Sequence, residues 1–158
     1  MKIAIKCIDG SVQIMTLVKG AAEDAIGKWK QQWPGKYVSH REMPDDAIPT
    51  DRTFREAWTD TTPEAVIDID MAKAREIHLT RLRAERDALL IKLDQESIKA
   101  QDQGLTEELQ IIRATKQALR DLPDTIQADL AAAKTTDELK QIRPELLDTS
   151  VQRSVQKD

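Results

Sequence analysis

The chain has 158 residues, of which 33% are charged, and a formal net charge of −4. This composition is typical of a soluble, helix-rich protein, and the acidic balance does not favour a general nucleic-acid binder, which needs a clustered positive field. One cysteine, Cys7, excludes an intrachain disulfide, and the sequence has neither a signal-peptide pattern nor an apolar run that could cross a bilayer. We therefore expect a protein made in a cytoplasm, with no membrane partner and with Cys7 as a small apolar residue of a strand.

The aromatic residues divide the chain into two parts. All of them lie before position 60, and the rest of the chain is dominated by Leu, Ile, Ala, Glu, Gln, Arg and Lys. A head of about 60 residues is marginally stable on its own, because small domains bury too little of their surface. We therefore expect an aromatic-bearing head and a helical arm, completed by each other or by oligomerisation.

The first segments predict a β-hairpin. Residues 2–8 and 11–18 are rich in β-branched residues and are separated by Asp9 and Gly10. An Asp-Gly pair favours the left-handed angles of a two-residue type I′ turn, so we expect that turn here.

A helix and a third strand are expected next. Residues 21–33 carry apolar side chains at helical spacing, and Trp29 and Trp33 lie four residues apart as core or interface residues. Residues 36–43 can form a strand. The order so far is ββαβ.

The remainder of the head is expected to contain two short elements. Residues 51–58 predict a short helix with Phe54 and Trp58 on one face, and residues 65–69 predict a short strand. Residues 1–69 together predict a small α+β domain.

A long helix follows, over residues 71–101, with Asp70 as its N-cap. It contains neither Gly nor Pro, and its apolar stripe is wide enough to pack against more than one neighbour. The residues of that stripe are Ile77, Leu79, Leu82, Ala84, Leu89, Ile91, Leu93 and Ile98.

Gly104 is expected to end this helix, and a second helix is expected to start near Thr106 and stop at Pro123. Its apolar edge consists of Leu105, Leu109, Ile112 and Leu119. Two long helices joined by a short loop predict an antiparallel α-hairpin over residues 70–123.

Residues 124–147 predict short C-terminal helices. Asp124 and Thr135 each begin a capping-box sequence, which predicts helices over residues 125–134 and 136–142. Residues 148–158 are polar and lack apolar periodicity, so we expect this tail to be disordered unless something holds it.

A search for catalytic, metal and cofactor motifs finds none. His40 and His78 lack metal-ligand spacing, and the glycines match no phosphate-binding loop. Asp68 and Asp70 could be metal ligands, but a strand end and a helix cap explain them better. We expect no catalytic residue, no cofactor, no metal and no enzymatic activity.

The strongest basic cluster lies on the long predicted helix and consists of Arg75, Arg81, Arg83 and Arg86. Acidic residues interrupt it, so a solvated helix with ion pairs is the preferred interpretation. A site for phosphate or an acidic partner is the alternative.

Several segments resemble a family of small proteins encoded among bacteriophage and prophage structural genes, and the helical arm of phage tail and tail-fibre assembly proteins. The resemblance covers about residues 50–123. It rests on residues 51–58, 67–71, 74–78, 81–86, 89–90 and 93–94, and on the block Lys-Gln-Ala-Leu-Arg-Asp-Leu-Pro at 116–123. It implies a phage context without enzymatic activity, and it implies no particular binding residues.

The sequence thus leads to the hypothesis of a non-enzymatic virion protein of the tail, baseplate or tail-fibre apparatus, made in the host cytoplasm. Its expected partners are other phage structural proteins and further copies of itself. A tail-fibre assembly chaperone is one alternative, and an intracellular regulator that binds nucleic acid or a host protein is another. The residues expected to pack or to bind partners are Trp29, Trp33, Phe54, Trp58, Ile77, Leu82, Leu89, Ile91, Leu109, Ile112 and Leu119.

Overall fold

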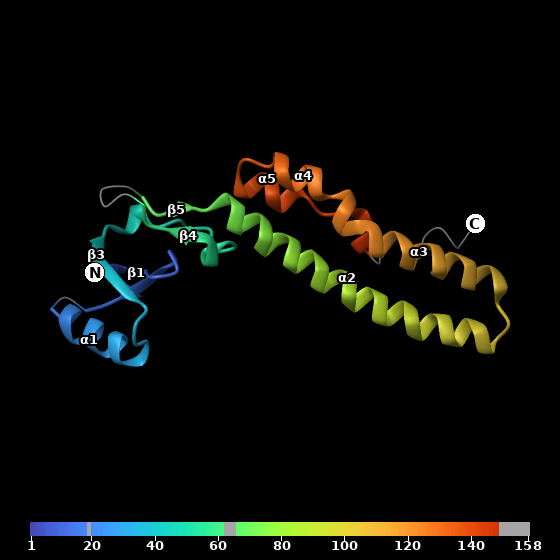
Figure 1. Cartoon of the computed structure of the whole chain (residues 1–158), viewed down its shortest axis with the longest axis horizontal. Helices are drawn as coiled ribbons and strands as arrows, with labels where there is room; N and C mark the ends of the chain where they lie inside the picture. The colour runs from blue at the N-terminus through green and yellow to red at the C-terminus, as the bar shows by residue number, and fades with distance from the viewer. Residues whose placement is uncertain (19, 62–65, 149–158) are drawn as a thin grey trace. The chain divides into compact units, whose positions relative to one another are not determined.

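The computed structural model describes residues 1–18, 20–61 and 66–148. Its contacts divide the chain into two compact units, Met1–Ala74 and Arg75–Asp158, which we call the head unit and the arm unit (Figure 1). The head contains a three-stranded antiparallel sheet and the arm contains helices, which confirms the predicted α+β class. The division falls a few residues past position 69, because the first turn of the long helix groups with the head.

The head unit has the expected ββαβ order. Strands β1 (Lys2–Cys7) and β2 (Val12–Thr16) form the hairpin, helix α1 (Ala22–Gln32) follows, and strand β3 (Tyr37–Met43) completes the sheet. Strand β1 lies in the centre and pairs antiparallel with both neighbours.

The central strand is apolar on both faces, so each face of the sheet supports its own core. On one face Ile3, Ile5 and Cys7 pack against Ile26 and Trp29 of α1, and all five are buried. This confirms that Cys7 is a buried apolar residue of a strand.

The other face of the sheet packs against the segments that follow β3. Ala4 and Val12 meet Met43 and the buried residues Ile48, Trp58 and Ile67. The short η1 turn (Asp45–Ala47) is tied to this layer because the backbone N–H of Ile67 donates to the carbonyl of Ala47.

The hairpin turn differs from the predicted type I′ geometry. Gly10 has φ +78°, whereas Asp9 has no positive φ, and a type I′ turn requires both. The N–H of Gly10 donates to the carbonyl of Cys7, and the carboxylate of Asp9 accepts hydrogen bonds from the N–H and hydroxyl of Ser11. The short polar side chain therefore stabilises a longer turn in which only the glycine is left-handed.

The helix predicted over residues 51–58 is absent. Asp51 instead accepts a hydrogen bond from the N–H of Thr53, which favours a turn, and only one 3-10 turn forms at η2 (Arg55–Ala57). The chain then extends as β4 (Trp58–Thr59) and pairs antiparallel with β5 (Asp68–Ile69). Of the strand predicted over residues 65–69, only Asp68–Ile69 is one, and residue 65 lies outside the described residues.

The long helix α2 spans Met71–Asp102, close to the expected limits. Asp70 caps it, since its carboxylate accepts from the N–H groups of Ala72 and Lys73 at 2.9 and 3.1 Å. Gly104, with φ +70°, ends it as predicted.

Helix α3 (Thr106–Thr125) returns antiparallel to α2 as the orange helix of Figure 1. The prediction that Pro123 stops this helix is wrong, because Pro123 lies inside its last turn. Proline removes one hydrogen bond of the helix and disfavours its continuation, and α3 ends two residues after Pro123. At that end the hydroxyl of Thr125 and the N–H of Ile126 both donate to the carbonyl of Leu122.

Helices α4 (Gln127–Ala132) and α5 (Thr136–Gln141) and the η3 turn (Glu145–Leu147) follow. The predicted cap at Thr135 is confirmed, since its hydroxyl accepts from the N–H of Glu138. Asp124 is not a cap, because it lies within the last turn of α3. Of the predicted polar tail, residues 149–158 lie outside the described residues.

Candidate interaction surfaces

Helix α2 uses one face to build the arm unit. We call this the inner face and define it by Leu82, Leu89, Leu93 and Ala100, which recur every four or seven residues on one side of the helix. Leu82, Leu93 and Ala100 are buried and Leu89 is half-buried. Across from this face, α3 contributes Leu119, Leu122 and the following Ile126, all of which are buried.

Polar contacts fix the C-terminal helices to the same side of α2. Arg75 donates from Nη2 to the carbonyl of Ala133 at 2.7 Å, and His78 Nε2 lies 2.9 Å from the carbonyl oxygen of Ile142. Arg143 forms an ion pair with Glu85 at 2.9 Å. These contacts hold both ends of α5 against α2.

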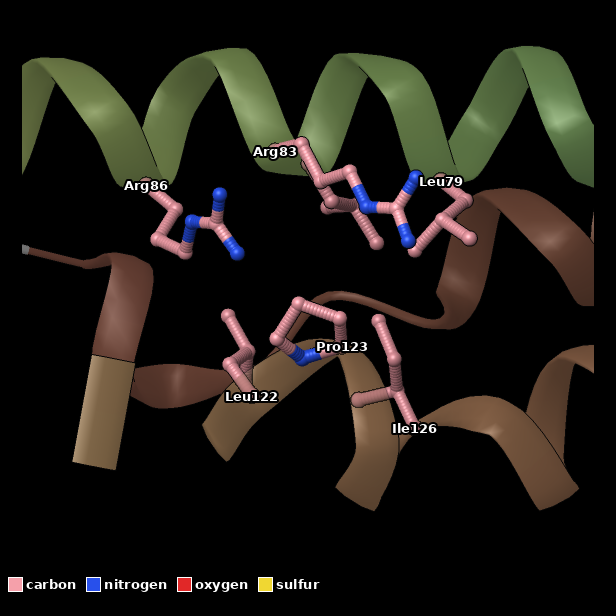
Figure 2. Close-up of a pocket in the computed structure, with 7 residues that line it drawn as sticks. Leu79, Arg83, Arg86, Leu122, Pro123 and Ile126 are labelled. Carbon is pink, nitrogen blue, oxygen red and sulfur yellow. The ribbon is translucent and has the colours of Figure 1, made fainter. Parts of the chain in front are cut away.

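A shallow cleft lies between α2 and the end of α3 (Figure 2). Arg83 and Arg86 extend into it from α2, toward Leu122, Pro123 and Ile126. Arg86 donates two hydrogen bonds to Asp87, at 3.0 and 2.8 Å. Arg75 has its contact with Ala133 and Arg81 also interacts within the chain, so at least three of the four clustered arginines already have partners.

The opposite face of α2 is also apolar. We call it the outer face and define it by Ile77, Ala84, Ile91 and Ile98, which recur every seven residues. Ile91 lies nine residues after Leu82, about two and a half helical turns, and therefore points to the other side. Ile91 and Ile98 are 62% and 61% exposed, Ala84 is exposed and Ile77 is half-buried. The wide stripe expected from the sequence is thus two separate stripes, of which one is exposed.

The head unit has a smaller exposed cluster, which we define by Ile8, Trp33 and Lys36. Ile8 is 73% and Trp33 40% exposed, and the ammonium of Lys36 lies 4.7 Å from the Trp33 ring. The N–H of Ile8 donates to the carbonyl of Lys36, so the two residues are neighbours at the end of β1. Ile8, Trp33 and Lys36 therefore form one exposed cluster of the head unit.

The residues predicted to pack or bind partners fall into three groups. Buried within the chain are Trp29, Phe54, Trp58, Leu82 and Leu119. Half-buried are Ile77, Leu89, Leu109 and Ile112, and exposed are Trp33 and Ile91. The first group builds the cores of the two units. Partner binding by any of these residues stays a prediction.

Sequence reasoning overlooked that Ile98 and Ala84 belong with Ile91 as a separate face. Their seven-residue spacing was the available signal, but spacing alone does not say which of two apolar stripes a neighbouring helix will cover. The packing of α3 determines which of the two stripes is covered.

The two histidines have partners within their own units. His40 Nδ1 lies 2.7 Å from the hydroxyl of Tyr37, and His78 contacts the backbone of Ile142. In residues 1–18, 20–61 and 66–148, no three His, Cys, Asp or Glu side chains are grouped as a metal site would require. None of the helices in these ranges is long and apolar enough to span a membrane.

No known protein family, no curated protein and no solved structure matches this chain.

Proposed function

We propose that this protein is a non-enzymatic structural component of a bacteriophage particle, in the tail, baseplate or tail-fibre apparatus. It acts through contacts with other proteins. The observation that carries the proposal is the exposed outer face of α2, which lies opposite the face that folds the arm. Exposed isoleucines on a regular face are typical of a surface that a partner covers.

The resemblance over residues 50–123 supplies the phage context of the proposal, and it includes all of α2. The head cluster at Ile8, Trp33 and Lys36 supplies a second contact region in this proposal. A rod-like helix pair with apolar residues exposed on one side suits a subunit that joins neighbours in a larger assembly.

The partners of Arg75 and Arg86 lend no support to the alternative of a nucleic-acid-binding regulator. Both side chains are half-buried and donate hydrogen bonds within the arm unit. A phosphate-binding surface needs arginines that are free to reach the phosphates.

Mass spectrometry of purified phage particles tests the proposal. A structural component is present in the washed particle at a fixed copy number. Detection in infected cells but not in particles would instead favour the assembly chaperone.

A pair of variants then tests which surface acts in assembly. Ile98→Asp alters the outer face without entering a core, whereas Leu93→Asp buries a charge on the inner face and should unfold the arm. We expect Ile98→Asp to remain folded and yet to be missing from particles. Normal incorporation of folded Ile98→Asp would contradict a role for the outer face in assembly.

A further inference from the structure

The outer face of α2 has opposite charges along its two edges. Asp87 and Asp94 lie along one edge, seven residues apart, and Lys92 and Lys99 lie along the other, also seven residues apart. All four residues are exposed. Asp87 also pairs with Arg86 and Asp94 with Lys116 of the same chain, and both carboxylates keep more than half of their surface in solvent. The apolar stripe between the two edges, Ile77, Ala84, Ile91 and Ile98, has the same seven-residue period. A helix with this repeat matches the pattern by which two helices associate along a shared seam.

From this arrangement we infer that the outer face binds a second copy of this chain, with the two α2 helices side by side and parallel. The acidic and basic edges of the outer face favour a second α2 helix as the partner and a parallel direction for the pair. In a parallel pair the acidic edge of one helix meets the basic edge of the other. Asp87 then faces the partner's Lys92, and Asp94 faces the partner's Lys99, each five residues further along.

An antiparallel pair would bring like charges together. Rotation about an axis perpendicular to the helices places Asp87 and Asp94 opposite the partner's acidic edge and Lys92 and Lys99 opposite its basic edge. Like charges at these edge positions disfavour a pairing, as they do between designed coiled-coil helices. The asymmetry of the two edges therefore favours the parallel arrangement.

In a heptad repeat the seam also includes the residues three positions before Ala84, Ile91 and Ile98, which are Arg81, Ala88 and Gln95. These residues fit a parallel pair of moderate strength. Ala88 is small and lets the helices approach, while Gln95 meets the same residue of the partner, with which its amide can form hydrogen bonds. A polar residue at such a position fixes the register of a parallel pair and lowers its stability. Arg81, the third seam position, already interacts within its own chain.

The arm leaves this face open. Helix α3 and the C-terminal helices α4 and α5 attach to the inner side of α2, for example where His78 contacts Ile142. Lys116 of α3 reaches as far as Asp94, on the acidic edge of the outer face. Figure 1 shows α3 along one side of α2, with no arm helix on the other. Within the described residues of the arm unit, the outer face of α2 is therefore accessible to a second copy.

This inference deepens the proposed function, because it names one partner of the outer face, but the two can fail separately. Self-association is a property of the purified protein, whereas the phage role is tested on particles. A protein that self-associates but is missing from particles would refute only the phage role.

Disulfide cross-linking tests both the face and the direction. Ala84→Cys and Ile98→Cys place thiols on the outer face, about 21 Å apart along the helix. In a parallel pair each residue meets its own counterpart, so both single variants should form disulfide-linked dimers under mild oxidation. The wild type is the matched control, because its single cysteine, Cys7, is buried.

Two results would overturn the inference. An antiparallel pair can join at most one of the two positions to itself, so cross-linking at 84 or 98 alone contradicts the parallel arrangement. Cross-linking at neither position, with both variants folded by circular dichroism, contradicts pairing through this face.

A substitution at the seam tests the same inference without cysteine. The double variant Ile91→Ser with Ile98→Ser should raise the Kd for self-association at least about tenfold, since it removes two large apolar side chains from the interface. The double variant Val18→Ser with Val38→Ser changes two exposed residues of the head, outside the cluster of Ile8, Trp33 and Lys36, and is the control. An equal effect of both double variants would count against the outer face.

Discussion

Arg41 and Asp60 join the edge strand β3 to the residue after β4 through a two-pronged ion pair. Nε of Arg41 lies 3.0 Å from one carboxylate oxygen, and Nη2 lies 2.8 Å from the other. Their side chains are only 21% and 10% exposed, so water competes little for these hydrogen bonds. The pair connects the three-stranded sheet to the layer that contains Trp58.

We predict that Asp60→Asn lowers the free energy of unfolding by about 1.5–3 kcal/mol, the range for hydrogen bonds to charged groups. Urea denaturation followed by circular dichroism measures it. Asp45→Asn is the control, because Asp45 is 81% exposed in its pair with Lys2, and exposed pairs contribute about 1 kcal/mol or less. Equal losses in both variants would show that burial of the Arg41 pair has no effect.

Because α3 packs against the inner face of α2, truncation of a buried residue of α3 should lower the free energy of unfolding more than truncation of an exposed one. Leu119→Ala removes a buried side chain and should cost about 2–5 kcal/mol of unfolding free energy through lost burial and a cavity. Ile111→Ala, at a residue 53% exposed on the same helix, should cost much less. If Ile111→Ala were the more damaging change in urea denaturation, the assignment of faces on α3 would be wrong.

Asp70 caps the longest helix with two hydrogen bonds, which predicts a graded response to substitution. Asp70→Ala should cost about 0.5–2 kcal/mol, the usual range for loss of an N-cap side chain. Asp70→Ser keeps an acceptor oxygen and should retain most of the unfolding free energy. The cap would be irrelevant if the alanine and serine variants unfolded at the same urea concentration.

The hydrogen bonds of the hairpin turn predict a lowered pKa for the carboxyl group of Asp9. The hydrogen bonds from the Ser11 hydroxyl and then from its backbone N–H lower the pKa of Asp9 below its ordinary value of 3.8. Since the folded pKa is depressed, this contribution to stability is complete above the unfolded pKa and disappears as pH falls through the folded pKa.

Ser11→Ala removes the larger of these two causes and should move the pKa of Asp9 back toward 3.8. Carboxyl NMR titration of both proteins measures the shift. The same Asp9 pKa in wild type and variant would refute the role of the hydroxyl.

Much of the fold follows from local signals in the sequence. The strands around Gly10, the cap at Asp70 and the helix end at Gly104 each depend on a few adjacent residues, and the structure has all three. The errors occur where two local signals compete. Asp51 forms a turn where a helix was expected, and α3 extends two residues past Pro123, where Thr125 and Ile126 donate to the carbonyl of Leu122.

The candidate interaction face was harder to predict than the fold. Both stripes of α2 are apolar, and the sequence alone does not distinguish the residues that bury within the chain from those that stay exposed. Leu82 and Ile91 differ in this respect only because α3 packs on one side. The distinction therefore needed tertiary structure.

In our proposal, α2 folds the arm with one face and joins a second chain with the other. Sedimentation equilibrium of the wild type and of the Ile91→Ser, Ile98→Ser double variant, from low to high micromolar concentration, tests it most directly. We predict that the wild type associates as concentration rises while the double variant remains a monomer with an unchanged circular dichroism spectrum. A wild type that remains monomeric throughout, or a double variant that associates equally well, would contradict the claim.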